Sequence, residues 1–430
     1  MTTKSFVYNP NNLCGFFYLI ETMGTNKKPV QLKVFIDKQK KKVIFAEADE
    51  DFVDVLFSFL TLPLGTIARL SLKHGDSKDI KIGSLTSLYE SVVNLNTKHF
   101  SEQSNKDILI YPKNSSSYTC RWLKVNLDHE AKDEYDVRYF GIFDDRESAA
   151  VFLKNMGNFI ITDNLNVVPV MLDTSIVLLN SLGVENINLL EERTMCFGLE
   201  EFLDLLRWSL LTNNPLTNLV FGGDKTCSSS CITNSTSTNA ALPSSNCGKT
   251  VKFLVQKSNG KLLCAQVEKF FVEMLFSFLT IPLGRFIRLT KDSSPPSGII
   301  NLYNSISSLG DENNLKYEKT QLLCPNLDGH YFRVTDLLPI YKDNARKGSF
   351  LKGQSTFIVS NNLEVKASLS VATISNFNTI GIPVADMEVQ EVSIGEHEAL
   401  LLLKASLTST SALTDCFSAF LKKPQVKSST

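Results

Sequence analysis

The sequence predicts an α+β protein built by tandem duplication, each copy having β-hairpins and short helices packed on small mixed or antiparallel sheets. Residues 33–70 align without a gap on residues 252–289, with almost half the positions identical. Short β-prone runs and helix-spaced apolar residues follow each other without the regular alternation of a βαβ series. The 430 residues, 43% hydrophobic and 21% charged, are in the ordinary globular range and allow more than one core.

The repeat is strongest in LFSFLTLPLG at 56–65 and LFSFLTIPLG at 275–284, which differ at a single position. Chance does not explain such a match, and further similar segments follow in the same order in both halves. They are LIYP at 109–112 with LLCP at 322–325, FIITDNLNV at 159–167 with FIVSNNLEV at 357–365, and the closing segments that start at Glu201 and Glu398.

The two copies are separated by a stretch rich in Ser, Thr and Asn. Its small polar side chains cannot bury enough apolar area to offset their ordering entropy, which predicts a flexible linker. The sequence therefore predicts a disordered extension at 1–27, a first repeat domain at 28–221, the linker at 222–248, a second repeat domain at 249–422 and a disordered tail at 423–430.

A β-hairpin is predicted at the start of each copy. Residues 33–36 and 43–46 are β-prone and flank the polar turn 37–42, and the second copy has Ser-Asn-Gly at its turn, 258–260.

The next element is predicted to be a very apolar helix. Asp49 or Asp51 can cap its start, and Pro63 and Gly65 are expected to end it. Its other faces are apolar too, so it must be buried nearly all round or meet a partner, and we favour burial. The residues at three- and four-residue spacing are Phe52, Leu56, Phe59 and Leu60.

The second part of each copy is predicted to mix strands and helices. In the first copy we expect strands at 159–163, 166–170 and 192–197, a helix at 175–182 and a final helix at 199–211, whose counterpart is 396–407.

Charge and hydropathy exclude several classes of protein. The 44 Lys and Arg residues nearly balance 45 Asp and Glu, which disfavours a nucleic-acid or anionic-membrane partner. No apolar run reaches the roughly 20 residues of a membrane span, and we expect neither a signal peptide nor a transmembrane helix. Nine cysteines without regular spacing favour a reducing compartment, so we expect an intracellular protein, cytoplasmic or nuclear.

A catalytic site used by both copies should appear in both. No histidine clearly occupies matching positions in both copies. The common nucleotide-binding, hydrolase, zinc and calcium motifs are missing from the sequence. We therefore predict no catalytic residue, no metal ligand and no cofactor, and we lean against an enzyme. Cys120 beside Arg121 is a candidate exposed thiol, without an evident partner base.

Two sets of basic residues are the candidate site residues. Arg69 and Arg288 occupy matching positions after the Leu-Gly turn and are candidates for an ion pair or an anion contact, of which we favour the structural ion pair. A basic hairpin tip is the other set, for which a solvated turn is favoured over contact with an acidic surface. It consists of Lys38, Lys40, Lys41 and Lys42.

The hairpin, the LFSFLTLPLG segment, the FIITDNLNVVP strand region and the closing helix together resemble a plant family known as domain of unknown function 674. The resemblance covers nearly all of both copies and implies an intracellular plant protein, without an activity or a catalytic residue. Many members carry a cysteine-rich, zinc-ribbon-like insertion, but residues 139–153 and 331–351 contain no cysteine. The resemblance therefore predicts no zinc site here.

The leading functional hypothesis is a non-enzymatic protein-protein interaction or scaffold module. The alternative is an enzyme or small-molecule binder with a site between the copies that uses Arg69, Arg288 and nearby carboxylates. A third, weaker alternative is nucleic-acid binding through the lysine-rich hairpin tips. The sequence leaves the protein partner and the oligomeric state open.

Overall fold

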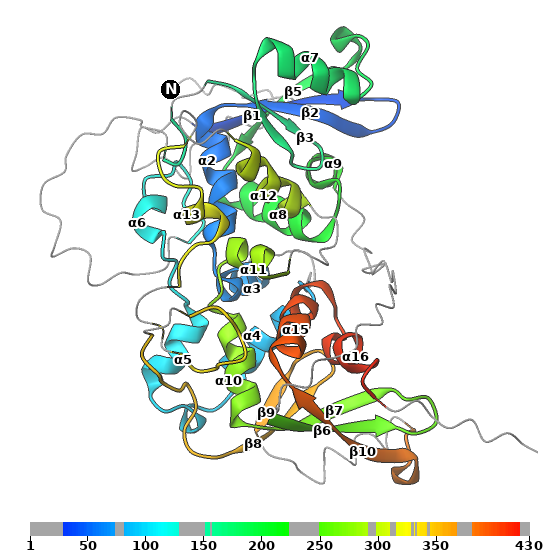
Figure 1. Ribbon diagram of the computed structural model, residues 1–430. Coiled ribbons are helices and arrows are strands. Elements are labelled where there is room, and N and C mark those ends of the chain that lie inside the picture. The colour runs from blue at the N-terminus through cyan, green and yellow to red at the C-terminus, as the bar shows by residue number, and fades with distance from the viewer. Residues whose placement is uncertain are drawn as a thin grey trace, which may run out of the picture.

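The computed structural model describes most of both copies (Figure 1). The predicted extension 1–27, the predicted tail 423–430 and all of the predicted linker except Gly222 lie outside the described residues. Those described are 29–73, 81–128, 151–154, 157–222, 249–290, 298–309, 315–327, 331, 333–341, 345–367 and 381–421.

The α+β prediction is confirmed, with two five-stranded antiparallel sheets whose strands run in the same order. The orders are β5-β1-β2-β3-β4 and β10-β6-β7-β8-β9, and most of the helices lie between the two sheets (Figure 1). The strands of the first sheet are β1 (Val30–Asp37), β2 (Lys42–Ala48), β3 (Phe159–Thr162), β4 (Val167–Pro169) and β5 (Glu191–Phe197). Those of the second sheet are β6 (Lys249–Gln256), β7 (Leu262–Glu268), β8 (Thr356–Ser360), β9 (Val365–Ala367) and β10 (Met387–Ile394).

The predicted apolar helix is also confirmed, as α2 (Glu50–Ser58) followed by the 3₁₀ turn η1 (Phe59–Thr61). Asp49 caps it, because its Oδ1 accepts a hydrogen bond from the backbone N–H of Phe52 at 3.1 Å. Every residue from Phe52 to Thr61 is buried, as the burial interpretation requires. The helix ends before Pro63, as expected, but a new helix, α3 (Leu64–Lys73), begins directly after Pro63 and includes Gly65.

The remaining helices include several that periodicity did not predict. In the first copy they are α4 (Leu85–Asn94), α5 (Gln103–Ile110), α6 (Ser117–Cys120), α7 (Leu172–Ser181), α8 (Leu199–Leu211) and α9 (Pro215–Phe221). In the second copy they are α10 (Lys269–Phe278), α11 (Leu283–Thr290), α12 (Gly298–Ser308), α13 (Thr320–Leu323), α15 (Glu396–Thr408) and α16 (Ala412–Phe417). The predicted final helices correspond to α8 and α15.

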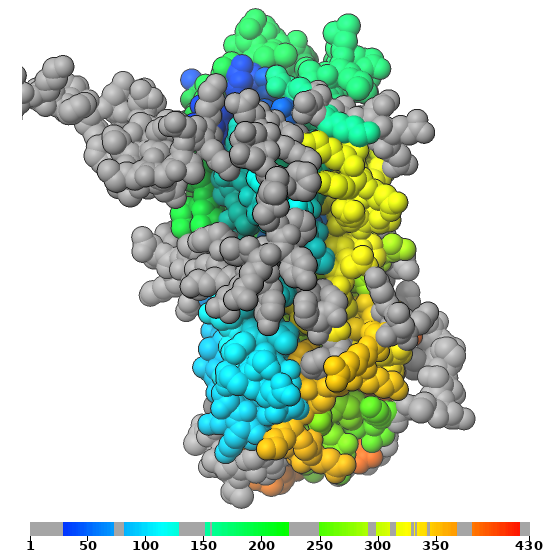
Figure 2. Space-filling model, turned by 90° about the vertical axis from the view of Figure 1, so that its left-hand side faces the viewer, coloured from blue at the N-terminus to red at the C-terminus, as the bar shows by residue number. Residues whose placement is uncertain are grey.

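The two copies exchange their middle segments. Helix α4 of the first copy packs against β9 and α10 of the second, whereas α12 of the second copy packs against β4 and α8 of the first. Figure 1 shows α12 beside α8, and α4 beside α10. In Figure 2 the second-copy segment coloured yellow to orange runs along the molecule from one half to the other. Each sheet is therefore covered by helices from both repeats.

Matched hydrogen bonds hold the exchanged helices. Ser91 in α4 accepts the backbone N–H of Val365 at 2.8 Å through its Oγ. Ser305, at the matching position in α12, accepts the backbone N–H of Val167 at 2.9 Å. The same contact made in both directions shows that the exchange follows an approximate two-fold symmetry.

The centre of this symmetry is an antiparallel bridge between Pro63 and Pro282. Beside it the N–H of Leu64 donates to the carbonyl of Ile281 and the N–H of Leu283 to the carbonyl of Leu62, both at 2.9 Å. Buried apolar residues of both copies form one continuous cluster across this contact. The repeats therefore share a core.

One glycine shows how closely the copies approach. Gly83, just before α4, has φ +50°, and a Cβ placed there would lie 2.6 Å from the carbonyl oxygen of Leu407 in α15. A side chain at this position would meet both backbone strain and a steric clash.

Candidate functional site

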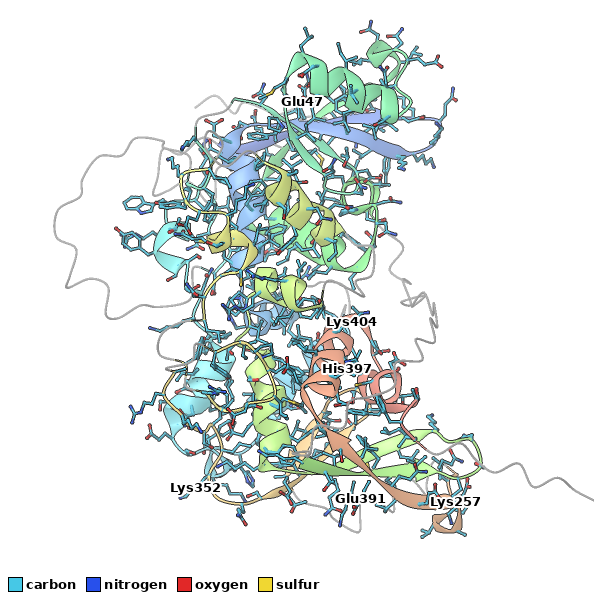
Figure 3. The ribbon with its side chains drawn as sticks, viewed as in Figure 1. Glu47, Lys257, Lys352, Glu391, His397 and Lys404 are labelled. Atoms are coloured by element: carbon cyan, nitrogen blue, oxygen red, sulfur yellow. The ribbon has the colours of Figure 1, made fainter. Side chains whose placement is uncertain are left out.

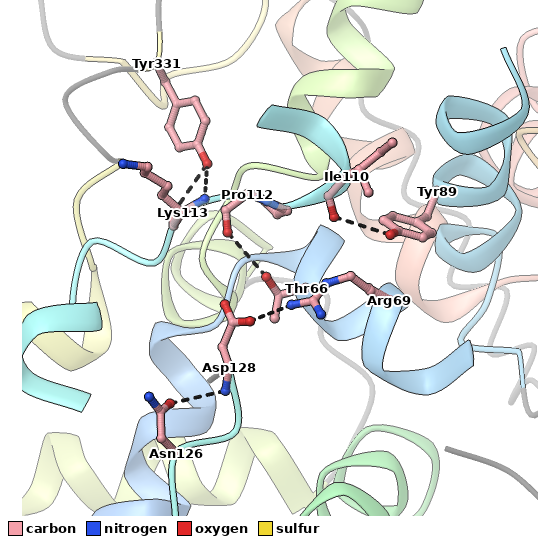
Figure 4. A network of polar contacts seen from close by, with 9 residues as sticks. All are labelled: Thr66, Arg69, Tyr89, Ile110, Pro112, Lys113, Asn126, Asp128 and Tyr331. Atoms are coloured by element: carbon pink, nitrogen blue, oxygen red, sulfur yellow. Dashed lines mark hydrogen bonds and ion pairs between the residues drawn. The ribbon is translucent and has the colours of Figure 1, made fainter. Parts of the chain in front are cut away.

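The two matched arginines have different surroundings. Arg69 in α3 is 3% exposed and its Nη2 lies 2.5 Å from Oδ1 of Asp128 (Figure 4). Its guanidinium lies 5.3 Å from the ring centroid of Tyr111. Arg288 in α11 is exposed, and its positive charge acts on the buried Tyr303. The arginine shared in sequence thus forms a buried ion pair in one copy and a surface charge in the other.

The other contacts around Arg69 hold backbone groups in place (Figure 4). Thr66 donates to the carbonyl of Pro112 at 3.4 Å, and the second copy repeats this contact, with Arg285 donating to the carbonyl of Pro325 at 3.1 Å. Tyr331 of the second copy accepts the backbone N–H of Lys113 at 2.6 Å. The polar groups of this region therefore fasten the segments that cross between the copies.

Replacing Arg69 by Met should lower the free energy of unfolding by about 3 kcal/mol, because Asp128 would be left as a buried charge without its main partner. Arg288→Met is the matched control and should change it by less than about 0.5 kcal/mol, because that side chain is exposed. Urea unfolding measures both values. Equal effects of the two substitutions would contradict a structural role specific to Arg69.

Cys120 does not match its interpretation as an exposed thiol. It is 3% exposed, and its sulfur lies 3.7 Å from Oγ1 of Thr61 and 3.9 Å from Nδ2 of Asn114. Burial raises the pKa of the Cys120 thiol to about 12. The thiol is therefore neutral near pH 7 and is not a reactive nucleophile.

The lysines of the hairpin tip are exposed, and two of them have acidic neighbours. Lys40 lies 3.4 Å from Asp37 and Lys38 lies 3.8 Å from Glu191. In the second copy, Lys257 lies at the corresponding tip (Figure 3) and donates to the carbonyl of Ala385 at 2.8 Å. Nearby carboxylates thus offset part of the positive charge of the first tip.

A pair of buried acids was missed by the sequence reasoning. Asp54 in α2 accepts hydrogen bonds from the backbone N–H groups of Val151, Phe152 and Leu153. Leu153 in turn forms an isolated antiparallel β-bridge with Leu315 of the other copy. Burial raises the pKa of the Asp54 carboxyl to about 7, against the opposing effect of the three N–H donors.

Glu273 occupies the matching position in α10. Its carboxylate accepts from the Ser349 hydroxyl at 2.5 Å and from the backbone N–H groups of Phe350 and Leu351 at 3.0 and 2.8 Å. Leu351 forms an isolated antiparallel β-bridge with Phe100 of the first copy. Burial raises the pKa of Glu273 as well. A carboxylate at the same position of both apolar helices was the available sequence signal, and its role is to hold the segment of its own copy that pairs with the other copy.

The outer side of the first sheet carries an exposed apolar surface, which we call the α7 face. Helix α7 covers the side of this sheet turned away from the shared core (Figure 1). Leu178 and Leu179 of α7 pack on a small separate cluster formed by Phe35, Phe45 and Ile160. The α7 face itself consists of Val170, Met171, Leu172, Ile176 and Val177, with Ile187 and Leu189 of the 3₁₀ turn η3 (Ile187–Leu189).

The exposure of this surface is unusual. Leu172 is 82% exposed, Leu189 79% and Val177 69%. Seven of the fifteen large apolar side chains exposed in the described part of the chain lie within residues 170–189, although single exposed apolar residues are normally scattered. A concentration of this kind marks a protein contact site in many soluble proteins, which makes the α7 face the candidate functional site.

Other kinds of site find no support within the described ranges. No group of three or more His, Cys, Asp or Glu side chains there is placed to hold a metal ion. No helix of those ranges has both the length and the apolar character needed to cross a membrane.

Comparison with known proteins identifies the family. The family model described as "Protein of unknown function (DUF674)" matches residues 26–141, 142–343 and 339–430. No curated protein and no solved structure matches the chain. Because the family model covers nearly all of both copies, the chain belongs to this family of proteins of unknown function.

Proposed function

We propose that the protein is a non-enzymatic interaction or scaffold module that binds a partner protein through the α7 face. The observation that carries the proposal is the concentration of seven exposed apolar side chains within residues 170–189, five of them on α7 and η3. Covering such a cluster removes apolar area from water, which favours association by roughly 25 cal/mol per Å² before the entropic cost of binding is subtracted.

The architecture also suits a scaffold. The shared core and the exchanged helices fix the first sheet relative to the second, so α7 is presented on a rigid body. A rigid binding surface lowers the ordering entropy lost on association.

An enzyme or small-molecule site between the copies is less well supported. The polar side chains of that region are engaged in holding backbone groups, as Thr66, Arg285, Asp54 and Glu273 do. Nucleic-acid binding through the hairpin tips is disfavoured by Asp37 and Glu191, which lie beside the tip lysines.

The double substitution Leu172→Ser with Val177→Ser should weaken binding to the cellular partner by at least about tenfold, because burying each apolar side chain contributes roughly 1.5–3 kcal/mol. Stability should change little, since both side chains are exposed. Val389→Ser, on a residue of β10 that is 62% exposed, is the matched control.

The measurement is photo-crosslinking in cells with a benzophenone amino acid at position 177 or at position 389, followed by quantitative co-purification of the proteins carrying the serine substitutions. A discrete protein adduct from position 177 alone supports the proposal. Equal labelling from both positions, or no reproducible adduct from position 177, would count against it.

A further inference from the structure

We infer that the partner meets the α7 face with an amphipathic helix whose apolar side is flanked by lysine or arginine. This inference rests on the proposed function and adds the chemistry of the partner to it. It follows from the shape, the charge and the backbone chemistry of the α7 face.

The charge of the α7 face is negative. Residues 170–190 contain Asp173 and Glu185 and no lysine or arginine. Both carboxylates are exposed, and neither forms an ion pair with a described residue. The next two acids do have basic neighbours, with Glu191 lying 3.2 Å from Arg193 and Glu192 3.0 Å from Lys33. The uncompensated charge beside the apolar cluster is therefore acidic, which favours a partner with basic flanks.

The shape of the α7 face favours a helical partner. Leu172 and Ile176 are one turn apart and form a ridge along α7, and Ile187 and Leu189 of η3, which follows α7 in the chain, are also exposed. The ten residues of α7 span about 15 Å, the length of two to three turns of a docked helix. The backbone N–H and C=O groups within a helix are already paired, so α7 offers side-chain packing rather than strand addition.

The size of the surface is adequate for specific association. Seven large side chains can supply much of the roughly 800 Å² that each partner contributes to an interface of standard size. A second copy of the chain fits less well, because an isologous contact uses the same patch on both subunits and would bring the acidic groups Asp173 and Glu185 near their equivalents.

Two synthetic peptide probes test the inference on the full chain. Both are labelled 18-residue amphipathic helices with leucine at positions i, i+3, i+4 and i+7, and they differ only in having lysine or glutamate beside the leucines. Fluorescence anisotropy should show that the lysine probe binds the native protein about tenfold more tightly than the glutamate probe. The double substitution Asp173→Lys with Glu185→Lys should reverse this preference.

Two control proteins distinguish a failure of the basic-helix inference from a failure of the proposed function. Leu172→Ser with Val177→Ser should abolish binding of the lysine probe, whereas Val389→Ser should leave it unchanged. Equal affinity of the two probes, with binding still lost in the serine protein, would overturn the basic-helix inference and leave the proposed function standing. Failure of both probes to bind, or a concentration-dependent dimer in sedimentation that the serine substitutions disrupt, would also overturn it. The crosslinking experiment tests the proposed function separately.

Discussion

Residues 1–235 and residues 236–430, produced as separate chains, are each expected to be unfolded, and mixing them should restore one folded 1:1 complex. The reason is the exchange of helices: α4 packs against β9 and α10 of the second copy as well as against its own α3 and α5, and its Leu85, Leu88 and Val92 are buried. Exposing each of them costs roughly 1.5–3 kcal/mol, and the first sheet would also lack α12. Such losses consume much of the roughly 5–15 kcal/mol by which a typical domain is stable.

Circular dichroism and amide NMR spectra of the fragments and of their mixture check this prediction. The control is the intact chain with a protease site inserted at the same position, which should stay folded after cleavage. Two fragments that each give a cooperative unfolding transition when isolated would contradict an obligatory exchange.

Asp54→Ala should lower the free energy of unfolding by about 3–6 kcal/mol. The substitution leaves the N–H groups of Val151, Phe152 and Leu153 without their acceptor in a buried site, at about 1–2 kcal/mol each. Asp51→Ala is the control, because Asp51 is a partly exposed acid in a surface ion pair with Lys124 and should cost under about 1 kcal/mol. Similar losses for the two substitutions would contradict the fastening role of Asp54.

The difference in unfolding free energy between the native protein and Asp54→Ala should depend on pH. The pKa of Asp54 is about 7 in the folded protein against 3.8 for the ordinary group, so between these values the folded state binds more protons than the unfolded state. The stability that Asp54 contributes is therefore complete below about pH 3.8 and falls as the pH rises to about 7, by up to about 4 kcal/mol. Urea unfolding from pH 4 to 8 should show the gap between native protein and Asp54→Ala narrowing with rising pH. A constant gap would contradict the raised pKa.

The sequence predicted the elements with strong local signals. The hairpins, the helix capped by Asp49 and the final helices were all recognisable because turn chemistry, capping and apolar spacing are local properties. The start of α3 at Leu64 was not, because proline ends one helix and is equally tolerated at the start of the next. The burial of Cys120 does not follow from its neighbours in sequence, because it depends on packing against residues far away in the chain, such as Thr61.

In the candidate site, too, the sequence predicts the local elements but not which of their side chains are exposed. The sequence predicts a strand end and a helix within residues 170–190. Their apolar composition does not indicate which side chains face solvent. Leu178 and Leu172 have the same side chain, yet only Leu178 packs on the sheet. They lie six residues apart in the helix, so they point to different sides of α7, and the packing of this helix on Phe35, Phe45 and Ile160 decides which side is buried.

The sequence by itself determined that this protein is a duplication and that both copies are α+β. Only the tertiary structure decided which helix packs on which sheet. The physical reason is that α4 and α12 carry the same Leu-Tyr pair, at Leu88-Tyr89 and Leu302-Tyr303, and the same serine, Ser91 and Ser305, so their local chemistry suits either sheet. Only chain geometry and the contact at Pro63 and Pro282 select the exchanged arrangement.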